Sequence, residues 1–320
     1  MLDGTYRYDQ LLTTISVRRT PGKMIAEALF PLVPLDNRSG KIPIFGPENL
    51  TPQDDLRAPG TESKLAKTSI TDTPYYIGGH SLKDGVPREY QTDVGPTWDL
   101  VRSKTLSLTD KVRLNREVAL VTLLAAGMTG TSLAAQTATP WNDDANDPIA
   151  LIKAQIDACQ LRGYGRPNLF APSRPVWTAI QANAYVQGRI TGAANLRSAL
   201  VTPQEFASLI EVDEVLIGEA TYNTAIQGQP MVGGWVWGEY ALLAVRPATP
   251  GPETPALGYH FGWRNALSML TNGAGVGNGP ELVERYWDQK TKQDVVEVHH
   301  FVDAKIVAMA AGCLFSDCLA

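Results

Sequence analysis

The stretch LSLTDKVRLNREVALVTLL, residues 106–124, repeats apolar side chains at steps of three and four. Across the wider segment 97–127 these steps form two neighbouring lines. They are Trp98, Val101, Thr105, Leu108, Val112, Asn115 and Ala119, and then Leu114, Val118, Val121 and Ala125. Such steps place side chains on one side of an α-helix. We therefore predict a helix of roughly 45 Å, which Pro96 can begin and GMTG ends.

Upstream of this helix, the segment from Lys41 to Pro96 lacks the apolar side chains that a local core needs. Between Gly46 and Pro74 the large apolar residues are Leu50, Leu56, Leu65 and Ile70. Yet KTSITDTPYYIGGHSL is rich in residues that favour β-strands. A segment with strand character and no core must lie on something else, so we predict an extended ribbon resting on a neighbouring subunit. The preceding EALFPLVPLDNRSGKIPIF contains three prolines and predicts an extended arm.

Downstream, helix and strand signals alternate, which indicates a mixed α+β fold. Asp147 and Pro148 predict the cap and first residue of a helix, and Thr202 with Glu205 forms a capping box. SRPVWTAIQANAYV predicts one helix, and RPNLFAP, EVLIGEA, GGWVWGEYALLAV and LGYHFGW predict strands. In ELVERYWDQKTKQDVVEVHHFVDAKI, two alternating runs flank the polar KTKQD, which predicts a β-hairpin.

Composition limits the classes of function. The chain is 44% apolar and 19% charged, which supports a packed core. Its net charge of -5 argues against tight, nonspecific nucleic-acid binding over the whole surface. The cysteines, Cys159, Cys313 and Cys318, form no CxxC motif and predict neither a disulfide framework nor a zinc site. No apolar run approaches the roughly 18 residues of a membrane span.

The adjacent His299 and His300 are the first candidates for a metal site. Neighbours in a strand point to opposite faces, so these two side chains cannot easily bind one ion, and zinc needs three or four convergent ligands. His300 shares a face with Val296, Val298 and Val302, and His299 shares one with Glu297 and Asp303. We expect one half-buried and one solvated histidine and no metal.

Three other motifs fall short of a catalytic or binding site. NGAGVGNGP, residues 272–280, has no GKS or GKT and no strand leading into a helix, so we expect a surface loop and no nucleotide. GGHSL lacks the final glycine of a nucleophile elbow and predicts a turn. WNDDANDP lacks calcium-loop spacing and predicts a loop that leads into a helix cap. We therefore predict no catalytic, cofactor-binding or metal-ligating residue.

In their order along the chain, these features resemble the major capsid proteins of tailed bacteriophages, the Hong Kong 97 fold. PLVPLDNRSGKIPIFGPENL resembles the arm that leads into the E-loop of that family, and residues 106–124, with REVA, resemble its spine helix. Similar phrases are WNDDANDPIALIKAQIDAC, RPNLFAPSRPVWTAI and VWGEYALLAVRPATPGPETPALGYHF. The likeness covers nearly the whole chain.

The resemblance implies a division of the chain into the parts of that fold. These are an N-arm at 1–40, an E-loop at 41–96, a P-domain with the spine helix at 97–160, an A-domain at 161–279, the P-domain hairpin at 280–305 and a C-terminal A-domain segment at 306–320.

The resemblance also implies a structural protein, not an enzyme, that self-assembles into an icosahedral shell enclosing a phage genome. Expected partners are further copies in hexamers and pentamers, scaffold, portal and decoration proteins, and packaged double-stranded DNA held loosely and without sequence specificity; no membrane is expected. Assembly would take place in the host cytoplasm and the protein would reside in the virion capsid. Two alternatives stay open: an encapsulin-like nanocompartment shell, and a metal- or nucleotide-dependent enzyme that uses His299, His300 or the glycine loop.

Overall fold

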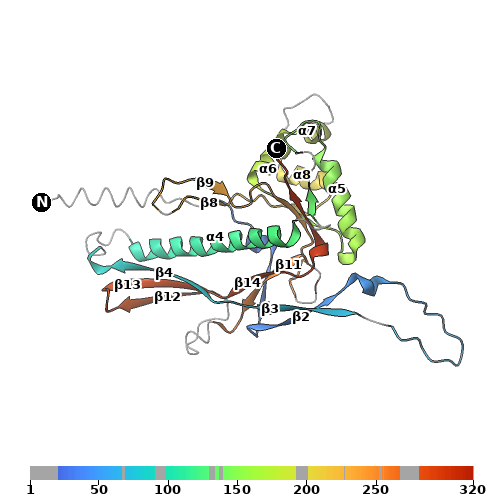
Figure 1. The fold of residues 1–320 in the computed structure, drawn as a ribbon, viewed down its shortest axis with the longest axis horizontal. Coiled ribbons are helices and arrows are strands. Elements are labelled where there is room, and N and C mark those ends of the chain that lie inside the picture. Colours follow the sequence, from blue (N-terminus) through green and yellow to red (C-terminus); the bar gives the residue numbers. More distant parts are fainter. Residues whose placement is uncertain are drawn as a thin grey trace.

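The computed structural model describes residues 21–66, 69–90, 99–129, 134–136, 140–191, 201–226, 228–251, 254, 256–266 and 281–319. They form an elongated α+β molecule (Figure 1). One long helix lies along a narrow antiparallel sheet and enters a broader body of helices and strands. A two-stranded ribbon extends from the end of the molecule opposite the tip of the narrow sheet.

The predicted long helix is α4, Leu100–Met128. It begins later than expected, because the Asp99 side chain accepts a hydrogen bond from the Arg102 amide and caps the first turn. Pro96, expected at the start, lies outside the described residues. The helix ends at Thr129, whose amide donates to the carbonyl of Ala125, so the predicted end at GMTG is confirmed.

Helix α4 buries different faces in its two halves. Near its start, Val101, Leu108 and Val112 pack against valines of the narrow sheet. Near its end, the buried residues lie about half a turn away around the helix axis. They are Glu117, Leu120, Val121, Leu124 and Met128, and Leu114 and Val118 lie at their edge. The predicted second line therefore lies at the edge of the face that is buried. The apolar pattern missed the centre of that face because polar Glu117 occupies it.

The narrow sheet has the strand order β12-β13-β4. Strands β12, Glu281–Asp288, and β13, Gln293–His300, form the predicted hairpin. Strand β4, His80–Pro87, pairs with β13 along its whole length. Val86 is buried against α4, so the ribbon without a core ends before β4, which the sequence did not predict.

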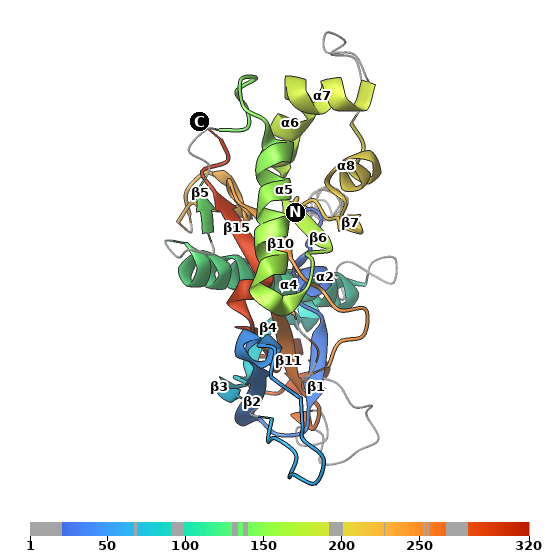
Figure 2. The ribbon, with the colours of Figure 1, turned by 90° about the vertical axis from the view of Figure 1, so that its right-hand side faces the viewer.

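The body contains a sheet with strand order β5-β15-β10-β6-β7. Its strands are β5 Ala134–Gln136, β15 Gly312–Ser316, β10 Ala241–Ala244, β6 Leu169–Pro172 and β7 Glu214–Val215. The strand nearest the C-terminus, β15, lies between β5 and β10, so the end of the chain is built into this sheet (Figure 2).

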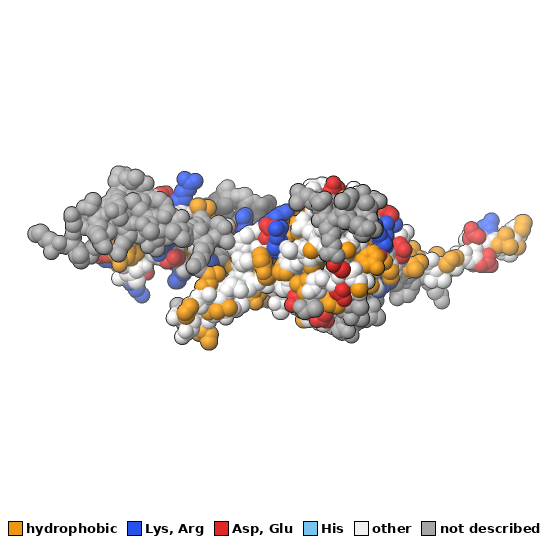
Figure 3. Space-filling view, turned by 90° about the horizontal axis from the view of Figure 1, so that it is seen from above, with side chains coloured by type: hydrophobic (Ala, Val, Ile, Leu, Met, Phe, Trp, Pro, Cys, Tyr) orange, Lys and Arg blue, Asp and Glu red, His pale blue; other side chains and the backbone are white. Residues whose placement is uncertain are grey.

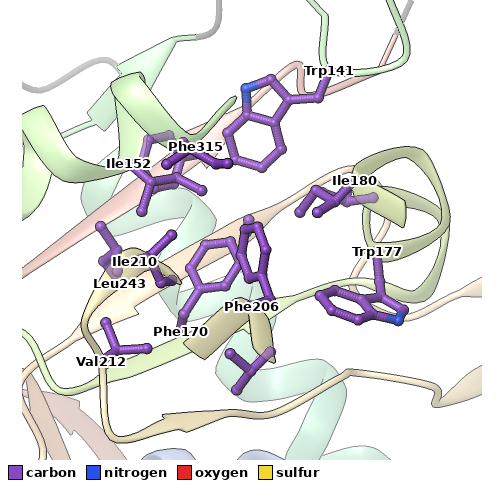
Figure 4. Close-up of a cluster of buried hydrophobic side chains, with 14 of the residues drawn as sticks. Trp141, Ile152, Phe170, Trp177, Ile180, Phe206, Ile210, Val212, Leu243 and Phe315 are labelled. Atoms are coloured by element: carbon purple, nitrogen blue, oxygen red, sulfur yellow. The ribbon is translucent and has the colours of Figure 1, made fainter. Parts of the chain in front are cut away.

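Helices cover this sheet and enclose the larger core. They are α5 Pro148–Cys159, α6 Arg174–Ala182, α7 Ala184–Thr191 and α8 Pro203–Ile210, and a π-helical turn, η2 Gln160–Tyr164, follows α5. Aromatic and aliphatic side chains from the helices and the sheet meet between them (Figure 4). Phe206 lies between Phe170 and Trp177, with ring centroids 5.8 and 5.6 Å away.

A third sheet, β1-β11-β14, joins the body to the narrow sheet. Its strands are β1 Leu32–Leu35, β11 Gly258–Trp263 and β14 Val302–Ile306. Two separate two-stranded sheets are formed by β2 Ser39–Phe45 with β3 Ile70–Tyr76, and by β8 Thr221–Asn223 with β9 Gly233–Trp235. Short helical turns are α2 Ala26–Leu29, η1 Pro47–Leu50 and η3 Met309–Ala311.

Two predicted elements are interrupted. The helix expected over SRPVWTAIQANAYV is two helices, because Asn183 is extended and its side-chain amide donates to the carbonyls of Trp141 and Asn146. The strand expected over GGWVWGEYALLAV is broken by a turn in which Gly238 has a φ of 48°. The Asp147 cap and the capping box of Thr202 with Glu205 are confirmed.

Candidate assembly surfaces

The two candidate histidines lie on opposite faces of β13, as predicted. The His300 ring is buried and stacks on His80 with centroids 5.0 Å apart. His299 Nε2 lies 3.6 Å from Glu284 and 3.7 Å from Glu297. The expectation that one of the pair is solvated is wrong, since the His299 side chain is only 16% exposed. No group of three metal-ligating side chains occurs in the part of the chain that the structure describes.

The other motifs have ordinary places in the fold or lie outside it. In GGHSL the predicted turn is wrong for the last three residues, because His80 begins β4 of an antiparallel sheet, which is also not the strand–turn–helix of a nucleophile elbow. WNDDANDP leads into the Asp147 cap of α5, as predicted. The glycine stretch 272–280 lies outside the described residues.

The ribbon formed by β2 and β3 is firmly rooted at one end. Ile42, Tyr75 and Ile77 are buried together with Val33 and Phe261. Further out, the side-chain amide of Asn49 donates to the Ser69 carbonyl and accepts from the Ser69 amide, at 2.8 and 2.7 Å. These two bonds tie the strands together, so the chain beyond them forms one loop, 50–66 within the described residues.

The far part of the ribbon is uncovered. Its four large apolar side chains are all exposed: Leu50 by 65%, Leu56 by 79%, Leu65 by 87% and Ile70 by 53%. Within the described residues, the loop is braced by an ion pair between Lys64 and Asp54. The prediction that this stretch has no core within its own subunit is confirmed.

The chain before the ribbon packs into the core of the body, although the sequence predicted an extended arm. Ile25, Leu29 and Phe30 are buried beside α4, and β1 runs parallel to β11. The buried Glu117 carboxylate accepts hydrogen bonds from the amides of Ile25 and Ala26. Residues 21–35 therefore belong to the core of the folded subunit.

Glu117 also ties this segment to the body. The indole nitrogen of Trp237 donates to the same carboxylate at 2.6 Å. Burial raises the pKa of Glu117 above its ordinary value, and the hydrogen bonds from Trp237, Ile25 and Ala26 oppose that rise. Next to it, Arg116 pairs with Glu27 and with Glu281 of the hairpin. The REVA phrase thus joins three segments that are distant in sequence.

A second uncovered surface lies on the hairpin β8–β9, which the sequence analysis did not single out. Its exposed apolar side chains are Ile226, Met231, Val232 and Trp235. The signal was present: no charged residue occurs between Glu219 and Glu239, in a chain that is 19% charged.

No family model matches the chain. Among curated proteins, the major capsid protein of Burkholderia phage BcepMu is 24% identical over 268 residues, which is 78% of this chain and 82% of that protein. The major capsid protein of Pseudomonas phage JBD67 is also 24% identical, over 77% of this chain and 79% of that protein.

Solved structures share the fold at low sequence identity. A phage-related protein from Bordetella bronchiseptica superposes with a TM-score of 0.68 and 22% identity over 97% of both chains. The capsid of cyanophage P-SCSP1u gives a TM-score of 0.58 and 9% identity over 93% of this chain and 89% of that chain. The chain is a phage major capsid protein of the Hong Kong 97 fold. As a capsid protein it is a component of the virion and has a structural role, not an enzymatic one.

The capsid protein shares its fold with a second kind of shell. The SrpI encapsulin of Synechococcus elongatus gives a TM-score of 0.54 and 12% identity over 97% of this chain and 94% of that one. The curated sequence relatives named above are phage proteins. Among the described residues of the capsid protein, no helix is both long and apolar enough to cross a membrane.

The narrow sheet of the capsid protein has an exposed edge as well. On β12, Val283, Tyr286 and Trp287 are exposed, whereas Val296 and Val298 on the neighbouring β13 are buried under α4. The helix covers the middle of the sheet and leaves its edge strand open. Ribbon, hairpin and sheet edge therefore give one subunit three uncovered apolar surfaces.

Proposed function

We propose that copies of this capsid protein assemble, as hexamers and pentamers, into the icosahedral shell that encloses a phage genome. One observation carries the proposal: a subunit with well-packed cores leaves the four large apolar side chains in the far part of its ribbon in solvent. Apolar burial contributes roughly 25 cal/mol per Å², so covering them on a neighbouring copy stabilises the assembly. Interfaces that are always occupied bury roughly 2,000–5,000 Å².

The parts of the chain take the roles of the Hong Kong 97 fold. We assign the N-arm to 1–40, the E-loop to 41–96, the P-domain to 97–160 and 280–305, and the A-domain to 161–279 and 306–320. Three features support the assignment: the long helix α4 over the hairpin β12–β13, the exposed ribbon, and the helix-covered body. Within the E-loop, the described residues 50–66, 69 and 70 are exposed, whereas Tyr75, Ile77 and Val86 are already buried.

The genome that the shell encloses is double-stranded DNA, held loosely. The net charge of -5 disfavours tight binding to phosphates, which suits a container that must release its contents. Scaffold, portal and decoration proteins complete the expected set of partners, and assembly takes place in the host cytoplasm. These partners come from the capsid role.

A nanocompartment shell is the second candidate, because the same fold is found in an encapsulin. The cargo separates the two functions. Particles made in the native host should contain DNA if they are phage capsids and protein cargo if they are nanocompartments.

Size-exclusion chromatography with light scattering, followed by negative-stain microscopy, tests the proposal. We expect capsomers or closed shells of the purified protein, alone or with a scaffold. A strictly monomeric protein at high concentration, in every salt and scaffold condition, would contradict it.

A further inference from the structure

The hairpin β8–β9 protrudes from the body, and no other residue that the structure describes covers the apolar side chains toward its tip. Ile226 near its tip is 81% exposed, and Met231, Val232 and Trp235 are exposed beside it. In the view from above, it forms a finger of apolar and uncharged atoms (Figure 3). An isolated two-stranded hairpin is marginally stable in water, so a partner surface would stabilise this one.

The shape of the hairpin is nevertheless defined. The Thr224 amide donates to the Val232 carbonyl at 2.9 Å, and the Val232 amide donates to the Asn223 side chain at 3.0 Å. Its apolar side chains are therefore presented on a formed support, which lowers the entropic cost of binding.

The chemistry of the hairpin limits its partner. Nucleic acid is bound through Lys and Arg on phosphates, and the segment from Ala220 to Gly238 contains neither. A partner that offers apolar side chains fits best. The far part of the ribbon offers such side chains, with Leu56 at 79% and Leu65 at 87% exposure.

The placement of the two surfaces favours contact between copies. Ribbon and hairpin project in opposite directions along the long axis of the molecule (Figure 1). One subunit therefore cannot join its own ribbon to its own hairpin, whereas a head-to-tail arrangement of copies joins each ribbon to the next hairpin. Contacts between two different surfaces form rings, the symmetry of a capsomer, when the rotation from copy to copy closes.

We propose that the E-loop ribbon of one copy packs its far apolar side chains on the β8–β9 hairpin of the next copy. The inference rests on the proposed shell function and identifies the surface that receives the ribbon. The eight residues from Thr51 to Ala58 can extend at most roughly 27 Å, which is long enough to cross the three-residue strands of the hairpin.

Engineered cysteines test the pairing directly, because the three native cysteines are buried. Ile226→Cys and Leu65→Cys are made in separate preparations, co-assembled and oxidised mildly. We expect covalent dimers only in the mixture, and a ladder of multimers from the double variant. Leu161→Cys, at 88% exposure on η2, replaces Leu65→Cys in the control and should give no dimer.

Charge substitution gives a second, independent readout. Ile226→Lys should reduce shell yield at least tenfold, and adding Leu65→Glu should restore most of it, whereas Leu161→Lys should leave the yield unchanged. Circular dichroism and melting confirm that each variant is folded, as expected for side chains in solvent.

Failure of this inference is distinguishable from failure of the shell function. If the wild-type protein forms no shell, the proposed function is wrong. If the wild type forms shells but the mixture gives no dimer, the pairing is overturned, as it is if Ile226→Lys assembles normally. The pairing is also overturned if the ribbon crosslink is absent and Ile226→Lys loses assembly only because it no longer binds an added scaffold or decoration protein.

Discussion

Trp237 Nε1 donates a 2.6 Å hydrogen bond to the buried carboxylate of Glu117, 120 positions earlier in the chain. The same carboxylate accepts hydrogen bonds from the backbone amides of Ile25 and Ala26. A single acidic side chain in the middle of α4 therefore ties the N-terminal segment to the body.

Replacing Glu117 by Ala should strongly destabilise the subunit. At least three buried donors would lose their acceptor, at about 1–3 kcal/mol each. That is a large part of the roughly 5–15 kcal/mol of a typical domain. Urea denaturation measures the loss. Glu205→Ala, which removes the exposed capping-box carboxylate that accepts a hydrogen bond from the Thr202 amide, serves as control with about 1 kcal/mol. Equal losses in the two variants would contradict the role of Glu117.

Glu117→Gln should reveal the raised pKa of this carboxyl. The folded state holds the Glu117 proton more tightly than the unfolded state, so it binds more protons in the window between the ordinary glutamate value and the raised one. Stability of the wild type therefore falls as pH rises through that window, and the amide variant has no such group. The unfolding free energy of Glu117→Gln, relative to that of the wild type, should increase as the pH is raised from 4. A constant difference would disprove the raised pKa.

His300 should make the subunit less stable as the pH falls, which is the opposite of the effect of Glu117. Burial, with smaller contributions from Arg116 and His80, lowers its pKa from 6.5 to about 4. The unfolded state then binds more protons between these values, so stability is full above pH 6.5 and is lost as pH falls toward 4. His300→Phe can keep the stack on His80 and lose less stability on acidification. Parallel pH curves for the two proteins would rule this out.

Two leucines test the change of buried face between the two halves of α4. Leu120 is fully buried, and Leu120→Ala should cost about 2–5 kcal/mol. Leu106 lies on nearly the same line of the helix as Leu120, but in the first half of α4, which buries the opposite face, and it is 46% exposed. Leu106→Ala should therefore stay within about 0.5 kcal/mol. Chemical denaturation compares them. If Leu106→Ala were the more damaging change, the switch of the buried face between the two halves of α4 would be disproved.

Local signals made much of the fold predictable. The Asp147 and Thr202 caps and the hairpin around KTKQD depend on residues close in sequence, and all three are present. Long-range pairing was not predictable. The pairing of β4 with β13 joins segments more than 200 positions apart, and no local pattern encodes it. Glu117 was missed because a charged residue interrupts the apolar period on which the helix face was read.

Of the two candidate surfaces, one could be predicted from the sequence and the other could not. The ribbon was predicted from a shortage of apolar residues between Gly46 and Pro74, a property of composition that needs no structure. Of the hairpin β8–β9, only β9 fell within a predicted strand, GGWVWGEYALLAV, and residues 221–232 were assigned to no element, so their exposure became evident only from the structure. Its lack of charge was the available clue.

Removing the far part of the ribbon should separate folding from assembly. Replacing residues 51–66 with a short Gly/Ser linker keeps the Asn49–Ser69 bonds and the buried root at Ile42 and Tyr75. Loop entropy changes slowly with length, so the subunit should fold and melt within a few degrees of the wild type. Shells should be absent or irregular, because Leu56 and Leu65 no longer reach a neighbour.

The matched control replaces residues 51–66 by a Gly/Ser linker that is as long as the native segment and retains leucines at positions 56 and 65. It should recover assembly if apolar cover from the ribbon is what the shell needs, since only those side chains are restored. Thermal melting of the subunits and electron microscopy of the particles are measured on both variants. A deletion variant that unfolds would show that the far ribbon belongs to the core of its own subunit. A deletion variant that builds normal, stable shells would show that the neighbouring copy does not depend on it.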